Sequence, residues 1–232
     1  MLAFQLYQLQ QVDSERDALE KRVAELEALL ADRRALLSAE EGAQKAKAAY
    51  RAAQRALQEA EAKAQGLRDK LSRTENTLYG GSVTNPRELQ ALQAEVEMLK
   101  RHLEAAEDAQ LEAMLALEEA EKALNAAEEH LKAVKTERNT QEARWRGEIA
   151  SLQEKIGRLG KRRQAIAGAI PAEALSLYEK LRSKRGGQAV ALVSDGACDA
   201  CGAPLPPPVL QAARSSESLA FCPTCGRILC IL

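Results

Sequence analysis

The 232-residue sequence predicts a mainly α protein, with a long antiparallel two-helix coiled-coil hairpin followed by a small C-terminal β ribbon. Three observations support this fold class. Ala, Leu, Glu, Lys, Arg and Gln dominate the chain and only seven residues are aromatic, as is typical of long helices. Apolar residues recur in steps of three and four. All five cysteines lie in the last 35 residues, which marks a separate C-terminal part.

Composition and charge exclude several classes of protein. Most of the apolar content is Ala and Leu, so little material remains for the thick core of a metabolic enzyme. A net charge of −1 argues against attachment to nucleic acid or membrane by bulk charge. No apolar run reaches the ~20 residues of a membrane span, and the N-terminus leads into Gln-rich helix and not into a secretory core. We therefore expect a cytoplasmic protein with no membrane segment.

The first helix of the hairpin is predicted over residues 1–78. One seam of this helix carries a 3.5-residue repeat, formed by Leu9, Val12, Arg16, Leu19, Val23, Leu26, Leu30, Arg33 and Leu37. A turn at 79–86 follows, with the first Gly-Gly and the first Pro of the chain. We expect Gly80 to end the helix in a left-handed conformation, and Asn85 and Pro86 to begin the return helix.

The return helix is predicted to complete a hairpin that spans residues 1–170. Its seam runs from Leu89 to Trp145, and after one extra residue it resumes at Ile149 and continues to Ile170. Net charges of −4 for residues 1–42, +4 for 43–78, −7 for 86–121 and +5 for 122–163 place opposite charges side by side when the chain folds back. Glycines at 147, 157 and 160 predict bending near the end that carries the cysteines.

A short helix and basic linker are expected over 171–187, and a four-cysteine ribbon over 188–232. The ribbon holds two Cys-x-x-Cys-Gly sequences separated by twenty residues, which supply Cys198, Cys201, Cys222 and Cys225. Four thiolates suit one tetrahedral Zn²⁺ with no position open for water, so the metal is expected to be structural. A redox role for either pair is weakly supported, because no thioredoxin-like pattern surrounds it. Iron can occupy the same ligands, but a ribbon this small favours zinc.

Three further expectations concern the ribbon. Strands are predicted over 188–194, 219–221 and 228–232, and a stiff loop over Pro204–Pro208. The fifth cysteine, Cys230, is interpreted as an ordinary reduced thiol, with a substitute ligand or an intermolecular disulfide as alternatives. Because so small a ribbon has almost no core of its own, zinc binding is expected to be coupled to its folding.

Two motifs resemble one family of bacterial proteins, which combine a long coiled-coil hairpin with a four-cysteine zinc ribbon. The first is the turn Tyr-Gly-Gly-Ser-Val-Thr-Asn-Pro-Arg-Glu at 79–88, and the second is the pair of knuckles with Leu-Pro-Pro at 205–207. The resemblance covers essentially the whole chain. It implies a role in transcription or flagellar gene control, through the sigma-54 factor of RNA polymerase, or in RNA binding. Family ribbons usually have an aromatic residue where Cys230 stands.

Two candidate interaction surfaces follow. The tip surface consists of Tyr79, Val83, Thr84, Asn85 and Arg87, and it is either a recognition loop or a well-capped turn. No carboxylate lies between 79 and 85, so metal-dependent chemistry of the kind performed by hairpins in the polymerase channel is not expected. The basic neck consists of Lys161, Arg162, Arg163, Lys184 and Arg185, and it either attracts phosphate or is neutralised by salt bridges.

The sequence favours a non-enzymatic interaction or regulatory protein. His102 and His130 have no nucleophile at a recognisable spacing, and the chain has no phosphate-binding loop motif. We expect the hairpin to bind a component of the transcription apparatus, a sigma factor or RNA polymerase. The alternative is an RNA- or DNA-binding protein that uses the ribbon and the basic neck, and a plain spacer is a third interpretation. Apolar residues near the N-terminus leave both a monomer and a homodimer open.

Overall fold

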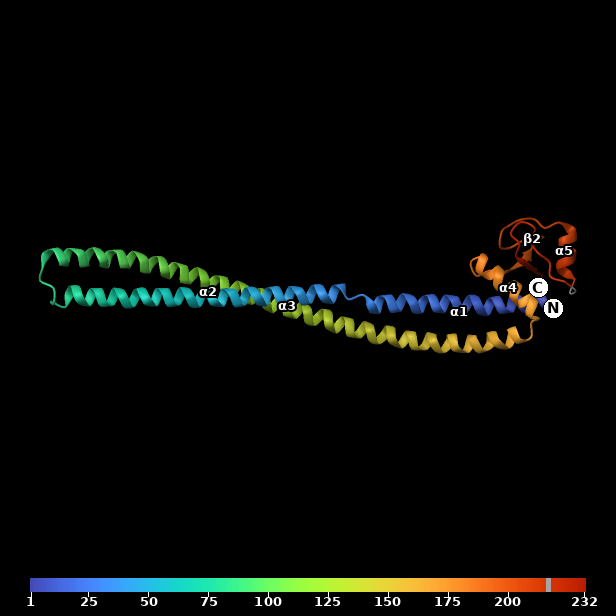
Figure 1. Cartoon of the computed structure of the whole chain (residues 1–232), viewed down its shortest axis with the longest axis horizontal. Coiled ribbons are helices and arrows are strands. Elements are labelled where there is room, and N and C mark those ends of the chain that lie inside the picture. Colours follow the sequence, from blue (N-terminus) through green and yellow to red (C-terminus); the bar gives the residue numbers. More distant parts are fainter. Residues whose placement is uncertain (216–217) are drawn as a thin grey trace. The chain divides into compact units, whose positions relative to one another are not determined.

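The computed structural model describes residues 1–215 and 218–232 (Figure 1). Its helices are α1 (Leu2–Ala31), α2 (Arg34–Tyr79), α3 (Pro86–Gly168), α4 (Ala172–Lys184) and α5 (Pro207–Arg214), and its strands are β1 (Val190–Ser194), β2 (Ala197–Cys198) and β3 (Ile228–Cys230). A long helical hairpin with a small C-terminal sheet confirms the predicted fold class. The chain divides into two compact units, Asp32–Thr140 and Met1–Ala31 with Gln141–Leu232. We call them the tip unit and the ribbon unit.

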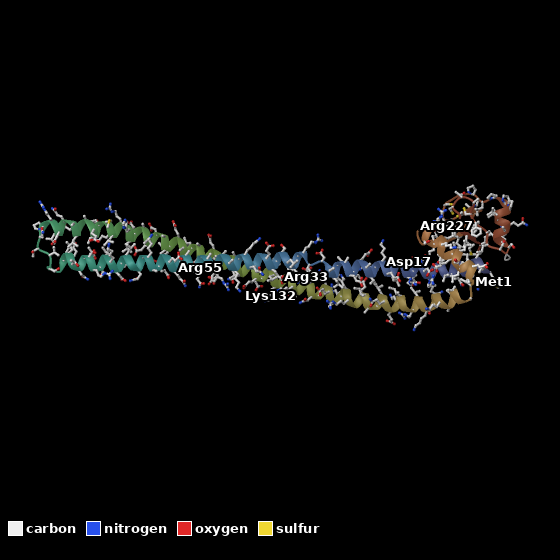
Figure 2. All side chains as sticks on the ribbon, viewed as in Figure 1. Met1, Asp17, Arg33, Arg55, Lys132 and Arg227 are labelled. Carbon is white, nitrogen blue, oxygen red and sulfur yellow. The ribbon has the colours of Figure 1, made fainter. Side chains whose placement is uncertain are left out.

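The tip unit is an antiparallel helix pair. Val96, Leu99 and Ala106 of α3 are buried, and so are small or apolar residues of α2, namely Ala39, Ala43, Ala64 and Leu78. Ion pairs cross between the helices from Arg68 to Glu107 at 2.8 Å, from Lys70 to Glu95 at 3.1 Å and from Lys135 to Glu40 at 3.6 Å. Exposed pairs of this kind contribute only tenths of a kcal/mol each, so they select register more than they supply stability. The side chains of this unit and of the ribbon unit are drawn in Figure 2.

The seam predicted for α3 is confirmed along its whole length, because every seam position from Leu89 to Ile170 is buried or half-buried. Helix α3 also runs through Gly147, Gly157 and Gly160 without interruption, whereas we expected bending near these glycines. The helical hairpin is interrupted in its other arm, between α1 and α2.

The prediction of one continuous first helix is wrong at residues 32–33. Helix α1 ends at Ala31 and α2 begins at Arg34. The carboxylate of Asp32 accepts hydrogen bonds from the backbone N–H of Arg34 at 3.0 Å and from its guanidinium at 2.6 Å. Arg138 donates to the carbonyl of Asp32. Such local hydrogen bonds compete with the backbone hydrogen bonds of a continuous helix. The repeat changes phase there, so that Leu37 is 54 % exposed although it was predicted on the seam.

The ribbon unit has a core that joins its helices to the sheet. Leu6 and Leu9 of α1 pack with Ile170, with Tyr178 of α4 and with Val190 of β1, and all five are buried. The N-terminal half of α1 therefore covers the ribbon, while the rest of α1 pairs with α3 through contacts such as the 2.8 Å ion pair from Arg22 to Glu148.

The sheet has the order β2-β1-β3. Strands β1 and β2 form an antiparallel hairpin, whereas β1 and β3 are parallel, with Val190 opposite Ile228. Residues 219–221 were predicted as a strand, but they contribute only an isolated bridge from Phe221 to Ile228. The proline-rich segment was predicted as a stiff loop, yet Pro207 begins α5. Prolines are tolerated in the first turn of a helix, where their missing N–H groups have no helical acceptor.

Candidate metal centre and interaction surfaces

Two glycine-containing knuckles position the four cysteines. The carbonyl of Cys198 accepts a hydrogen bond from the N–H of Gly202 at 2.7 Å, and that of Cys222 accepts one from Gly226 at 2.8 Å. Both glycines are left-handed, with φ of 71° for Gly202 and 72° for Gly226. A side chain would strain either turn, which is why each Cys-x-x-Cys is followed by glycine.

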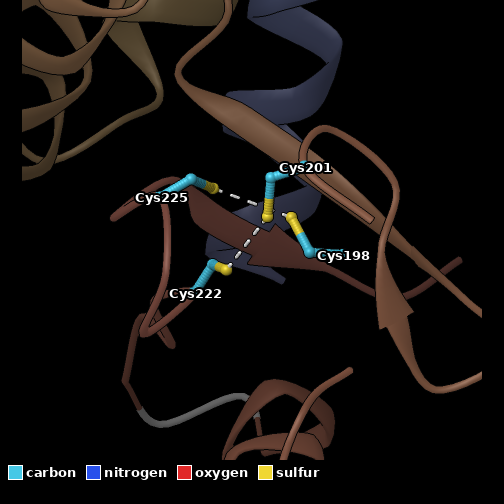
Figure 3. A group of neighbouring side chains, drawn as sticks. All are labelled: Cys198, Cys201, Cys222 and Cys225. Carbon is cyan, nitrogen blue, oxygen red and sulfur yellow. Dashed lines mark hydrogen bonds between the residues drawn. The ribbon is translucent and has the colours of Figure 1, made fainter. Parts of the chain in front are cut away.

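The four sulfurs converge on one point (Figure 3). All four Sγ atoms lie within 4.8 Å of one another, with Cys198 and Cys225 3.8 Å apart and Cys201 and Cys222 3.7 Å apart. A tetrahedral zinc with Zn–S bonds of ~2.3 Å places its sulfurs about 3.8 Å apart. The residues therefore fit one zinc ion, held by four thiolates from two loops. Three of these cysteines are buried and Cys201 is exposed.

The surroundings shift the pKa values of two buried cysteines, Cys198 and Cys225, in opposite directions. Burial raises the pKa of the Cys198 thiol to about 12. Burial also acts to raise the pKa of Cys225, but hydrogen bonds from the backbone and side chain of Arg227, together with those from Cys222 and Cys201, outweigh it and lower that pKa to about 6. The guanidinium of Arg227 also donates to the carbonyl of Gln188 at 2.9 Å. Arg227 thus favours the thiolate of Cys225 and ties the second knuckle to Gln188, just before β1.

The side chain of Gln10 in α1 forms hydrogen bonds with the backbone of the ribbon. Its side-chain Nε2 donates to the carbonyl of Val190 at 2.8 Å, and its Oε1 accepts the N–H of Val190 at 2.6 Å. The Gln10 side chain thereby satisfies both polar groups of a buried strand residue, as a neighbouring strand would do. Sequence reasoning missed this residue, because nothing in the pattern distinguishes it from the other glutamines of the N-terminal segment.

A buried carboxylate joins helices α1, α3 and α4 of the ribbon unit. Asp13 of α1 is 1 % exposed, and it accepts hydrogen bonds from Nε of Arg163 at 2.6 Å and from the hydroxyl of Tyr178 at 2.8 Å. Nε of Arg182 lies 3.7 Å from the same carboxylate. Burial raises the pKa of Tyr178 well above its usual range, and its hydrogen bond to Asp13 adds to this effect.

The five residues of the basic neck fall into two groups, according to whether they form ion pairs with described residues. Arg163 is held by Asp13 and Glu179, so its charge is neutralised within the ribbon unit. The remaining four cations, Lys161, Arg162, Lys184 and Arg185, are exposed and form no ion pair with the described residues.

The tip surface lies around the turn between α2 and α3. Tyr79 is 76 % exposed, and Thr84, Asn85 and Arg87 are also exposed, while Val83 is half-buried. Oδ1 of Asn85 accepts the backbone N–H of Arg87 at 3.1 Å, which confirms the predicted cap. The prediction for the first glycine is wrong: Gly80 ends α2 in a right-handed conformation.

The left-handed residue of the turn is Gly81, with φ of 73°. A Cβ at Gly80 would lie 2.5 Å from the carbonyl oxygen of Asn76, so both glycines are needed, for different reasons.

The remaining candidate residues fall outside these clusters. Cys230 is buried in the core of the ribbon unit, and burial raises its pKa. Its sulfur does not belong to the four-sulfur group found among the described residues. His102 and His130 are both exposed on α3. In the part of the chain that the structure describes, no helix is long and apolar enough to cross a membrane.

Comparisons with solved structures find the same fold. CT398 from Chlamydia trachomatis is 20 % identical with a TM-score of 0.82, and the match covers 100 % of this chain and 98 % of that one. A Mycobacterium smegmatis protein is 20 % identical with a TM-score of 0.68, over 99 % and 98 % of the two chains. HP0958 from Helicobacter pylori is also 20 % identical, with a TM-score of 0.51 over 98 % and 95 %. No curated protein matches this chain.

Family models identify both parts of the chain. The model of the CT398-like coiled-coil hairpin domain matches residues 7–186, and that of the C4-type zinc ribbon domain matches residues 197–229. The second match agrees with the four-sulfur geometry. The chain therefore belongs to the family of CT398-like coiled-coil hairpin proteins and carries a C4-type zinc ribbon.

Proposed function

We propose that this chain is a non-enzymatic interaction protein that binds a component of the transcription apparatus, a sigma factor or RNA polymerase, through the tip of its hairpin. The observation that carries the proposal is the tip surface, where an aromatic side chain that is 76 % exposed, Tyr79, precedes a turn whose far end is capped by Asn85. Tyr and Arg are enriched among residues that dominate binding energy at interfaces, and both Tyr79, at the end of α2, and Arg87, in the first turn of α3, are exposed.

The zinc ribbon supports a structural role for the metal. Four thiolates complete a tetrahedral shell, so no coordination position remains for a substrate or a reactive water. The two histidines on α3 are exposed and belong to no cluster of metal-ligating side chains among the described residues. The sequence resemblance directs the choice of partner towards sigma-54.

The test is a binding measurement with purified sigma-54 and core RNA polymerase on the zinc-loaded chain. The double variant Tyr79→Ser/Arg87→Ala removes two exposed side chains and leaves Asn85 and both glycines in place. We expect it to bind at least tenfold more weakly than the wild type. A control that changes Lys161, Arg162, Lys184 and Arg185 to Glu should bind as the wild type does. Undiminished binding by the tip variant would contradict the proposal.

The second candidate function is RNA or DNA binding by the ribbon and the basic neck. It is supported by the four exposed cations, which form no ion pair with any residue that the structure describes. Contacts to phosphate release counterions, so the affinity would fall steeply with salt. Fluorescence anisotropy with a labelled single-stranded RNA and a DNA duplex would measure it. Here the four-Glu variant should lose binding while the tip variant keeps it, which is the reverse of the outcome expected for a tip-bound protein.

A further inference from the structure

The middle of α3 exposes a compact apolar patch. Leu111, Met114 and Leu115 are 59 %, 43 % and 63 % exposed. Residues three and four apart lie on the same side of a helix, so these three side chains are neighbours. The neighbouring seam positions, Ala113 and Leu117, are half-buried. Single exposed leucines are common on protein surfaces, but three adjacent large apolar side chains on a helix that already has its seam filled require an explanation.

Carboxylates surround this patch. Between residues 102 and 121 the chain has no Lys or Arg, and it has seven acidic residues: Glu104, Glu107, Asp108, Glu112, Glu118, Glu119 and Glu121. Among the described residues only Glu107 of this set forms an ion pair, with Arg68 of α2. Asp108 precedes Leu111 by about one turn, and Glu118 and Glu119 follow Leu115 by about one turn. The apolar patch is thus bordered along the helix by unpaired negative charge.

We propose that Leu111, Met114 and Leu115 form a side-on docking surface for a basic amphipathic helix of a partner protein. Such a helix would bury its apolar stripe on the patch and place flanking Lys and Arg against the carboxylates. This charge complementarity selects the occupant. The surface differs from the tip, so this inference does not depend on the proposed function.

A second copy of the chain fits this surface less well. Helix α2 is the basic helix of the tip unit, with a net charge of +4 over residues 43–78. Its exposed large apolar side chains are Leu37 and Tyr79, at its two ends. Between them α2 offers positive charge but no large exposed apolar side chain to cover Leu111 and Leu115. The complementary surface needs both features on one helix.

The test uses a fluorescein-labelled 18-residue peptide of Leu and Lys, with Leu at helical spacing, and a matched peptide of Leu and Glu. Fluorescence anisotropy is recorded with the zinc-loaded full chain. We expect the Leu/Lys peptide to bind and the Leu/Glu peptide not to bind. The variant Leu111→Glu/Leu115→Glu should weaken Leu/Lys binding at least tenfold, although it adds two negative charges. The control Leu37→Glu changes an exposed leucine on α2 and should leave the affinity unchanged.

A second variant tests the carboxylates. Glu112→Gln/Glu118→Gln/Glu119→Gln should weaken binding at least fivefold and reduce its dependence on salt, and circular dichroism should show unchanged helix content. Equal binding by the wild type and the Leu111→Glu/Leu115→Glu variant would overturn the proposal. So would equal binding of the two peptides. A wild-type dimer in sedimentation that this variant converts to a monomer would also overturn it, because a second copy would then occupy the patch.

Discussion

Replacing Asp13 by Asn tests whether the buried carboxylate holds the ribbon unit together. The substitution keeps the side-chain shape and removes the charge that faces Arg163, Arg182 and Tyr178. Removing one partner of a buried ion pair costs about 3–5 kcal/mol. The side chains of Arg163 and Arg182 are 23 % and 20 % exposed, and they keep Glu179 and Asp17 as partners. This partial compensation lowers the expected loss of unfolding free energy to about 2–3 kcal/mol.

The assay is urea unfolding followed by the fluorescence of Trp145, which is the only tryptophan and belongs to the ribbon unit. Its matched control is Glu20→Gln, which breaks an exposed pair on the same helix, where Glu20 lies 2.9 Å from Arg16. Exposed pairs of this type contribute about 0.3–0.5 kcal/mol, so the control should barely change the midpoint. A loss below about 1 kcal/mol for Asp13→Asn, comparable with that of the control, would refute the reasoning.

Three further predictions concern the ribbon and the tip. Gln10→Ala leaves the N–H and carbonyl of Val190 unpaired, at a cost of about 1–3 kcal/mol. Hydrogen exchange at residues 188–194 should therefore accelerate, and unchanged exchange would show that water replaces Gln10. Removing zinc with a chelator should abolish the exchange protection of β1 and β3, while circular dichroism shows that the helices of the tip unit persist. A ribbon that stays protected without metal would contradict the coupling of binding and folding. Gly81→Ala places a side chain at φ of 73° and should cost about 1–2 kcal/mol of unfolding free energy. Gly66→Ala, with nothing within 4 Å of the added Cβ, should instead stabilise α2 by about 0.5–1 kcal/mol. Equal shifts of the melting temperature for the two variants would refute the assigned turn.

Much of the fold was predictable because it is encoded in short-range patterns. The steps of three and four from Leu89 to Ile170 identify the buried face of α3, and a helix with that period has only one way to bury it. The spacing of Cys198, Cys201, Cys222 and Cys225 predicts the metal centre for a similar reason, since each knuckle is a local turn closed by a glycine.

The failures arose where a side chain competes with the regular pattern. Asp32 bonds the backbone of Arg34 and ends α1, although the apolar repeat runs through that position. Pro207 begins a helix in a segment where proline suggested a loop. In both places the local hydrogen-bonding or conformational preference of one residue outweighs the composition of its neighbours.

The sequence alone thus determined the hairpin, its turn, the seam of its return helix and the four zinc ligands. Only the tertiary structure decided how the ribbon is held. Gln10 and Val190 are 180 residues apart in the chain, and Asp13 and Tyr178 are 165 apart. Contacts of this kind leave no periodic trace, because a single polar residue among many similar ones becomes a partner only when the fold buries it beside an unsatisfied group. The same holds for Arg163: the sequence left open whether it attracts phosphate or is neutralised, and the fold neutralises it with Asp13 and Glu179.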